Sequence, residues 1–444
     1  MRKAEHLPTF TADIASALGG PDWLRERRLE GFEAFSKQDL PSEAEEVWRY
    51  SPIDSLDLES YRPSVVEDGL GPADQSLVDE LVGQILERAA LCIVRDGSIV
   101  SIERGDLPEG VTIEAARAEG SLQPSIGQVV EGGDALVRLN DAFAPDVLSV
   151  VVPVGTVVSR PIVVVHLCTA GGDPAPAAFP RTVVRAERGS ECSVVEIVAP
   201  SGPGRSLVVP VAELLADEGS HLSFVSLQLL GDEAWYLGRI GARIERDAAL
   251  RAFTVGLGGA YDRCRTDAAV VGQGATSELR SAYLGTGEQI HDVRTLQDHA
   301  APRTDSDLLC KGAVAGSSRS VYSGLIRIRH GAVRSNAMHT NHNLVLDERA
   351  HADSVPNLEI EENDVRCSHA STVGPVDEDQ LYYLESRGVA PDRAERLIVA
   401  GFFADIVAKA PVPAVVPLLQ HEVAARLAAT LDEVVPTGGE DHHG

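Results

Sequence analysis

A short polar turn motif recurs four times between residues 187 and 275: Glu187-Arg188-Gly189-Ser190, Asp217-Glu218-Gly219-Ser220, Glu245-Arg246-Asp247-Ala248 and Gly272-Gln273-Gly274-Ala275. The third positions of these motifs are separated by 30, 28 and 27 residues. The segments between them contain short β-branched runs. A quasi-regular period of turn, strand, turn and strand is typical of a β-solenoid, in which each coil buries its inner face by stacking on its neighbours.

Short β-branched runs separated by polar turns continue over residues 91–375, where long stretches of helical periodicity are almost absent. Short strands at intervals of about 8–12 residues would look similar in a β-sandwich, which stays open as the alternative. We favour the solenoid because of the period. The clearest predicted strands are residues 147–152, 162–166, 193–198, 222–227 and 325–328.

Helical patterns flank this zone, and residues 1–90 form the first flank. We predict a helix over residues 22–36 and another over residues 74–90. The second helix would place five apolar residues on one face: Leu77, Val78, Leu81, Ile85 and Leu86. Between the helices runs an irregular link that contains Trp48-Arg49-Tyr50.

The second flank, residues 376–435, predicts three helices. Asp377 begins the first in the manner of a capping box, with Gln380 three positions later, and Gly388 ends it. Pro391 suits the first turn of a helix that runs to about residue 409. A third helix covers residues 415–434. We expect the tail, residues 436–444, to be disordered.

Charge and composition exclude several classes of function. The net charge is −28 and the pI is about 4.8, so the surface repels nucleic acid backbones and anionic lipid headgroups. No signal peptide and no apolar run of transmembrane length is evident. We therefore expect a cytoplasmic protein that binds neither nucleic acid nor membranes.

The six cysteines are scattered without a CxxC pair, and no short Cys/His cluster has zinc-site or ferredoxin spacing. In a reducing compartment they should be free thiols. A metal cluster held permanently by this chain alone is therefore not expected. The chain also lacks a P-loop, so any ATP-driven work requires an ATPase partner.

Candidate site residues gather between residues 330 and 369. His339, Asn341 and His342 form a polar segment, and Cys367-Ser368-His369 follows one strand later. Strand alternation would set Cys367 and His369 on one face, and imidazole and thiolate both suit iron. A stacked hydrogen-bonding ladder around a buried core cysteine is the other interpretation.

The segment from 300 to 410 resembles the SufB/SufD family of iron–sulfur cluster assembly scaffolds, and the Trp48-Arg49-Tyr50 link matches the family more loosely. Several motifs occur in the family's order and spacing: Ser320-Val321-Tyr322-Ser323-Gly324, Asn343-Leu344-Val345-Leu346, Pro356-Asn357-Leu358-Glu359-Ile360, Asp364-Val365-Arg366-Cys367-Ser368-His369, Thr372-Val373-Gly374 and Leu381-Tyr382-Tyr383-Leu384-Glu385-Ser386-Arg387-Gly388.

The resemblance implies a right-handed parallel β-helix flanked by helical regions. It implies a SufB-like scaffold as the heterodimer partner, joined through the β-helix ends, with a homodimer as the alternative when the chain is alone. It also implies a SufC-like ATPase that docks on the C-terminal helical region. The candidate docking residues are Leu381, Tyr382, Phe402 and Phe403.

Two positions indicate the SufD branch of the family. SufB-like sequences carry an essential cysteine 28 residues before the histidine that matches His369, and a glutamate directly after it. This chain has Asn341 and Ala370 there. The resemblance therefore implies that His369, and secondarily Cys367, contributes to a site shared with the partner, through which an iron–sulfur cluster passes transiently. His369 would be the metal-binding residue, and His339, Asn341 and His342 a secondary polar site.

We expect no catalytic turnover and no permanently bound cofactor. One competing hypothesis is a SufB-like builder that uses Cys310 or Cys367 as its thiolate. Another is a β-helix enzyme acting on acidic polysaccharides, which the acidic charge and the lack of paired carboxylates disfavour.

Overall fold

In the computed structural model, which describes residues 7–64, 69–118, 125–130 and 134–433, the recurrent turns stack into one column. Their third residues, Gly189, Gly219, Asp247 and Gly274, all have positive φ, between 55° and 77°. The amide of Gly189 donates to the carbonyl of Glu218 at 2.9 Å, and Gly219 donates in the same way one coil later. Glycine suits three of these positions because a left-handed backbone costs it nothing.

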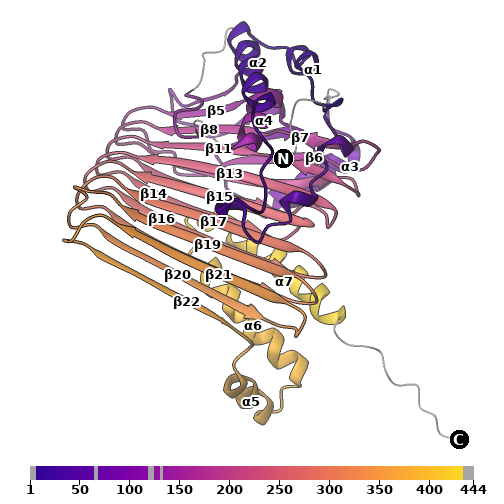
Figure 1. The fold of residues 1–444 in the computed structure, drawn as a ribbon, viewed down its shortest axis with the longest axis vertical. Coiled ribbons are helices and arrows are strands. Elements are labelled where there is room, and N and C mark those ends of the chain that lie inside the picture. Colours follow the sequence, from indigo (N-terminus) through magenta and orange to yellow (C-terminus); the bar gives the residue numbers. More distant parts are fainter. Residues whose placement is uncertain (1–6, 65–68, 119–124, 131–133, 434–444) are drawn as a thin grey trace, which may run out of the picture.

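Stacked turns bring successive strands into parallel register, and the result is a β-helix of about eight coils between residues 148 and 374 (Figure 1). This confirms the solenoid and excludes the sandwich. The ten-stranded sheet has the order β22 (Arg366–Gly374), β20 (Asn336–Val345), β18 (Asp305–Val314), β16 (Thr276–Gly285), β14 (Ala249–Gly256), β12 (His221–Gln228), β9 (Glu191–Ser201), β6 (Ile162–Thr169), β2 (Ala90–Arg95) and β3 (Ser98–Arg104).

The second sheet faces the first across the interior of the solenoid. Its main path is β21 (His351–Ile360), β19 (Arg319–Ile328), β17 (Ile290–His299), β15 (Tyr261–Val270), β13 (Ala234–Ile244), β11 (Val211–Ala216), β8 (Arg181–Ala186), β5 (Leu148–Val152) and β4 (Thr112–Ala115). Three short strands complete its twelve: β1 (Tyr61–Pro63), β7 (Ala175–Ala178) and β10 (Ser206–Val208).

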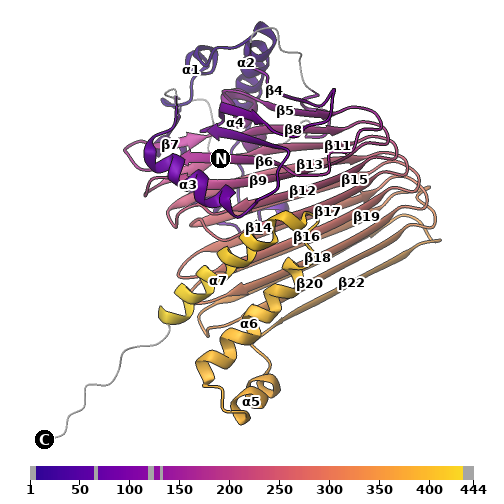
Figure 2. The same ribbon diagram turned by 180° about the vertical axis from the view of Figure 1, so that it is seen from behind.

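Helices cover one end and one side of the solenoid (Figures 1 and 2). At the end where the coils begin lie α1 (Ala12–Ala17), α2 (Asp22–Ser36) and α4 (Ala135–Phe143). Along the outer face of the ten-stranded sheet lie α3 (Pro72–Gly83), α6 (Pro391–Val407) and α7 (Val416–Glu433), with α5 (Glu378–Ser386) projecting beyond the last coil. No helix in the described ranges is long and apolar enough to cross a membrane.

Most predicted helices are confirmed, with two differences. Helix α3 ends at Gly83, because the chain from Ala90 pairs with β6 as strand β2, and Leu86 is therefore 86% exposed. Helix α4 lies inside the zone predicted as strands, where Asp134 caps it by accepting from the amides of Leu136 and Val137. The predicted tail, residues 436–444, lies outside the described residues.

The interior of the solenoid changes character along its axis. In the early coils it is filled by small apolar side chains such as Val150, Val184 and Leu214. In the last coils buried polar side chains replace them, including His291, Asn341 and Asn343. Buried polar groups cost free energy unless they find partners, so this end of the interior is where function is to be sought.

Candidate functional site at the open end of the solenoid

The last coil ends the solenoid with two edge strands, β21 and β22, one in each sheet (Figure 1). Strand β22 pairs with β20 in parallel register, which sets Cys367 beside Ala337 and His369 beside His339. Cys367 and His369 occupy alternate positions of β22, so both lie on the face that continues the interior of the solenoid. The structure thus brings the two predicted residues together.

His369 is exposed, whereas the residue stacked behind it is not. His339 is 1% exposed, and its ring centroid lies 5.7 Å from that of His369. Burial, reinforced by the neighbouring His369, lowers the pKa of His339 to about 4, so it is neutral at pH 7. Its Nε2 atom has no hydrogen-bond partner among the described residues.

Cys367 is half-buried against Ile326 and Ala337. Burial raises the pKa of its thiol above the usual value, so the protonated form prevails at neutral pH. The thiolate is the form that binds metal. Cys367 is therefore less suited than His369 to bind a metal ion at neutral pH.

Asn341 lies one coil inward, beside Cys310 in the ladder between β18 and β20. Both side chains are fully buried. Burial raises the pKa of the Cys310 thiol to about 12, although hydrogen bonds with Asn341 and Ser281 act in the opposite direction. Asn341 Oδ1 accepts from the side-chain amide of Asn343 at 2.9 Å.

His342 is separated from the other two residues of the predicted secondary polar site. It alternates with Asn341 along β20, so it faces outward from the ten-stranded sheet, beside Lys311 in register. Burial and the Lys311 ammonium both lower its pKa. The side chains of His339 and Asn341 therefore point into the interior of the solenoid, whereas the side chain of His342 points outward.

The side chains of the four predicted docking residues differ in their exposure to solvent. Tyr382 on α5 is 74% exposed, while Phe403 on α6 is 1% exposed and packs against the sheet. Leu381 and Phe402 are partly buried at the edge of the same cluster. A buried side chain supports the helix from beneath and does not meet a partner. A groove of about 400 Å³ lies between α5 and α6, and it is lined by Asp377, Asp379, Gln380, Tyr383, Leu384 and Ile398.

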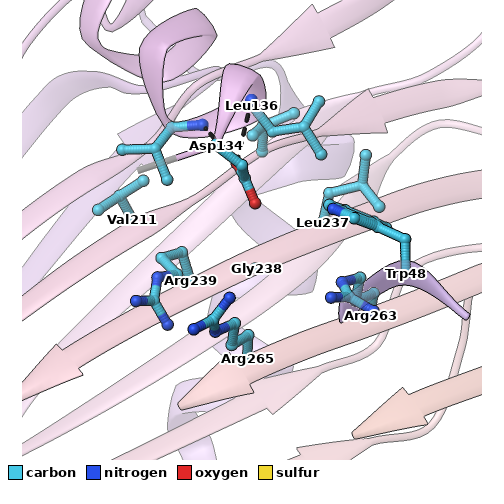
Figure 3. Close-up of a pocket in the computed structure, with 11 residues that line it drawn as sticks. Trp48, Asp134, Leu136, Val211, Leu237, Gly238, Arg239, Arg263 and Arg265 are labelled. Carbon is cyan, nitrogen blue, oxygen red and sulfur yellow. Dashed lines mark hydrogen bonds between the residues drawn. The ribbon is translucent and has the colours of Figure 1, made fainter. Parts of the chain in front are cut away.

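A separate enclosed cavity lies beneath Trp48, on the outer face of the twelve-stranded sheet (Figure 3). Arg239 and Arg265 in its wall share Asp267, and Arg263 stacks on the Trp48 ring at 3.8 Å. Its volume of about 20 Å³ admits one water molecule. The contact between Arg263 and Trp48 holds the N-terminal link against the sheet. The cavity itself is far too small for a metal cluster.

The open end of the solenoid carries few potential metal ligands. No group of three His, Cys, Asp or Glu side chains within the described ranges could hold a metal ion. Protein iron–sulfur clusters usually take four ligands. One exposed imidazole and one half-buried thiol at this end fall short of that number.

Sequence reasoning singled out His369 and Cys367, and named Cys310 only as a competing thiolate, but it missed the contacts that surround Asn341. Tyr283 crosses the next coil to bond Asn343, and Cys310 lies beside Asn341. The signal that could have found them is the coil period, which places residues about 29–31 positions apart in neighbouring coils.

Comparisons with known proteins agree with this geometry. Residues 167–402 match the SufBD core domain of the SUF system for FeS cluster assembly, and residues 16–164 match the N-terminal region of SufBD proteins. The chain is 25% identical to the iron–sulfur cluster assembly protein SufD of Escherichia coli over 368 residues, which cover 83% of this chain and 84% of that protein. It is 26% identical to SufD of Bacillus subtilis, with 89% and 92% covered.

An iron–sulfur cluster assembly SufBD family protein of Mycobacterium tuberculosis is more similar but over a shorter span. The two are 39% identical over 228 residues, which cover 50% of this chain. The match spans 55% of the mycobacterial protein, so the chain covers about half the length of these relatives.

Proposed function

This chain belongs to the SufBD family of the SUF iron–sulfur cluster assembly system, and we propose that it is a SufD-type scaffold subunit which completes its site with a SufB-like partner. The partner would join at the open end of the solenoid, and a SufC-like ATPase would dock on the C-terminal helices. The iron–sulfur cluster is the cargo of this site and is shared only transiently.

The observation that carries the proposal is the open end itself. Strands β21 and β22 end the two sheets as edge strands, and the exposed His369 lies on β22, on the face that continues the interior. Apolar side chains are also exposed there, since Ile360 and Val373 are each 44% exposed. An exposed edge strand is a template for pairing with another chain.

The environment of the thiols supports the SufD-type role over that of a primary cluster builder. A builder needs a thiolate that is accessible and ionised. Cys310 is fully buried with a pKa of about 12, and burial also raises the pKa of Cys367. His369 is the group best placed to reach iron, so the partner would supply thiolate and carboxylate ligands.

The C-terminal helices supply the surface proposed for the ATPase. Exposed Tyr383 lines the groove between α5 and α6, and its neighbour Tyr382 is also exposed. Exposed aromatic side chains beside a groove are common anchors of protein interfaces. We expect no turnover by this chain itself. All six cysteines are free thiols, which suits a reducing cytosol.

The test is cluster formation by the chain co-expressed with SufB- and SufC-like proteins, under anaerobic conditions with iron and a sulfur source. His369→Ala should lower the amount of cluster at least about tenfold, as expected when a ligand is lost, while native mass spectrometry shows an intact complex. His330→Ala is the matched control, because His330 is an exposed histidine on a turn away from the interior. Wild-type cluster content in the His369→Ala complex would refute the site.

A further inference from the structure

Lysine is rare in this chain, and one of its lysines lies in an unusual place. The sequence contains four lysines, Lys3, Lys37, Lys311 and Lys409. The side chain of Lys311 is only 11% exposed, because it projects from the outer face of β18 against helix α6. A lysine so nearly buried requires specific partners.

Lys311 makes three contacts, and all of them are with residues of helix α6. Its ammonium group donates to the carboxylate of Asp405 at 2.7 Å and to the main-chain carbonyl of Phe402 at 3.2 Å. It also lies 4.7 Å from the centre of the Phe402 ring. A charge, a carbonyl and an aromatic face thus hold one ammonium group between the helix and the strand.

The neighbours of Lys311 in sequence point into the solenoid. Cys310 precedes it and lies beside Asn341 in the ladder between β18 and β20. Gly312 follows it and lies beneath the ring of Tyr283, whose hydroxyl bonds Asn343. Strand β18 therefore contacts α6 on its outer face and contributes Cys310 and Gly312 to the polar interior behind His339 and His369.

The contact continues sideways onto β20. Lys311 is in register with His342. Burial lowers the pKa of His342, and the positive charge of Lys311 lowers it further. His342 alternates along β20 with Asn341, which faces inward. Strands in a hydrogen-bonded ladder cannot shift one at a time without breaking their bonds, so a pull on β18 is shared by β20.

We propose that Lys311 is a positioning residue of the cluster-assembly site, which transmits a displacement of helix α6 through β18 and β20 to the buried residues behind His369. This inference rests on the proposed function, since it assigns the force on α6 to a docked ATPase. Lys311 itself touches neither the cluster nor the ATPase groove between α5 and α6.

Lys409 provides a matched control. It donates to the same carboxylate of Asp405 at 3.2 Å, but it follows α6 directly in the chain and lies four residues from Asp405. Lys409→Met removes one ion pair within the helical region without loosening the helix from the sheet. Lys311→Met removes the attachment between helix and strand at similar side-chain volume.

The test uses the full complex with SufB- and SufC-like chains and measures cluster formation with and without ATP, together with ATP hydrolysis. Lys311→Met should keep complex assembly and ATP hydrolysis but reduce the stimulation by ATP at least about fivefold, the lower end of typical coupling between sites. Lys409→Met should retain the wild-type stimulation, and Lys311→Arg should restore part of it. Full stimulation in Lys311→Met would overturn the inference.

A second readout uses the isolated chain and does not depend on the proposed function. Hydrogen exchange of the peptide covering residues 336–345 should be faster in Lys311→Met than in Lys409→Met, because β20 loses its outer support. Equal exchange in the two variants would refute the role of Lys311 in holding the strands. If the wild-type complex shows no response to ATP, the proposed function fails, while the exchange experiment still decides the attachment.

Discussion

Gly312 shows how one residue determines the polar interior. A Cβ atom at this position would lie 2.0 Å from Cζ of Tyr283, whose hydroxyl reaches Asn343 at 2.5 Å. We predict that Gly312→Ala lowers the free energy of unfolding by about 1–3 kcal/mol, as overpacking does. Urea denaturation of the isolated chain measures it. Gly374→Ala is the control, since nothing lies within 4 Å of its added Cβ; equal effects of the two changes would contradict the account.

His299 makes stability depend on pH. It is buried between hydroxyl groups, with Nδ1 2.7 Å from Thr304 Oγ1 and Nε2 2.8 Å from Ser306 Oγ, and burial lowers its pKa to about 4 although Asp298 and Asp305 oppose this. Between pH 6.5 and about 4 the unfolded chain binds a proton that the folded chain does not. His299 therefore contributes a loss of stability as the pH falls through this window.

In the variant His299→Gln this side chain no longer binds a proton in either the folded or the unfolded chain. The slope of unfolding free energy against pH should change by about 1 kcal/mol per pH unit between pH 6 and 4.5, in the direction of losing the contribution from His299. Urea denaturation at several pH values measures the slope. An unchanged slope would show that His299 is protonated in the folded chain.

At the scale of the element, the column of left-handed turns holds the coils in register. Gly219 has a φ of 66° and donates to the carbonyl of Arg246 in the next coil. Gly219→Val should destabilise the chain by about 1–2 kcal/mol, because a β-branched residue disfavours this backbone region. Thermal unfolding compares it with Gly231→Val, where the backbone is not left-handed and the added Cβ meets no atom within 4 Å. A larger loss in Gly231→Val would contradict this explanation.

The same column shows what the sequence could and could not predict. Four turns were recognisable from their glycine and polar residues, and these sufficed to predict a solenoid. The column continues through Arg303 and Arg334, with φ of 59° and 61°, but arginine carries no turn signal. Helix α4 was missed for a similar reason, since its nine residues lie in a zone whose texture was otherwise that of strands.

The candidate site was predicted in part for reasons of the same kind. Alternation along β22 places Cys367 and His369 on one face, which follows from local sequence alone. The stacking of His339 on His369 depends on the register between coils, 30 residues apart. A degenerate period does not specify that register, so the separation of His342 from its neighbours and the position of Cys310 beside Asn341 required the structure.

At the scale of the whole molecule, the two ends of the solenoid differ. Helices occupy the beginning of the solenoid, while the last coil leaves two strand edges and an exposed histidine. An acidic chain with a charge of −28 resists indiscriminate pairing of such edges through repulsion between copies. A specific partner that offers complementary strands and the missing ligands would satisfy both features.

The most direct test of this account is hydrogen exchange of the chain alone and in the presence of a SufB-like protein, followed by mass spectrometry. Edge amides of β21 and β22 should gain protection when the partner binds, so peptides covering residues 351–360 and 366–374 should exchange at least about tenfold more slowly. Peptides from α1 and α2 should be unchanged. A stable complex in which β21 and β22 exchange as fast as in the free chain would contradict the assignment of the open end as the shared cluster-assembly site.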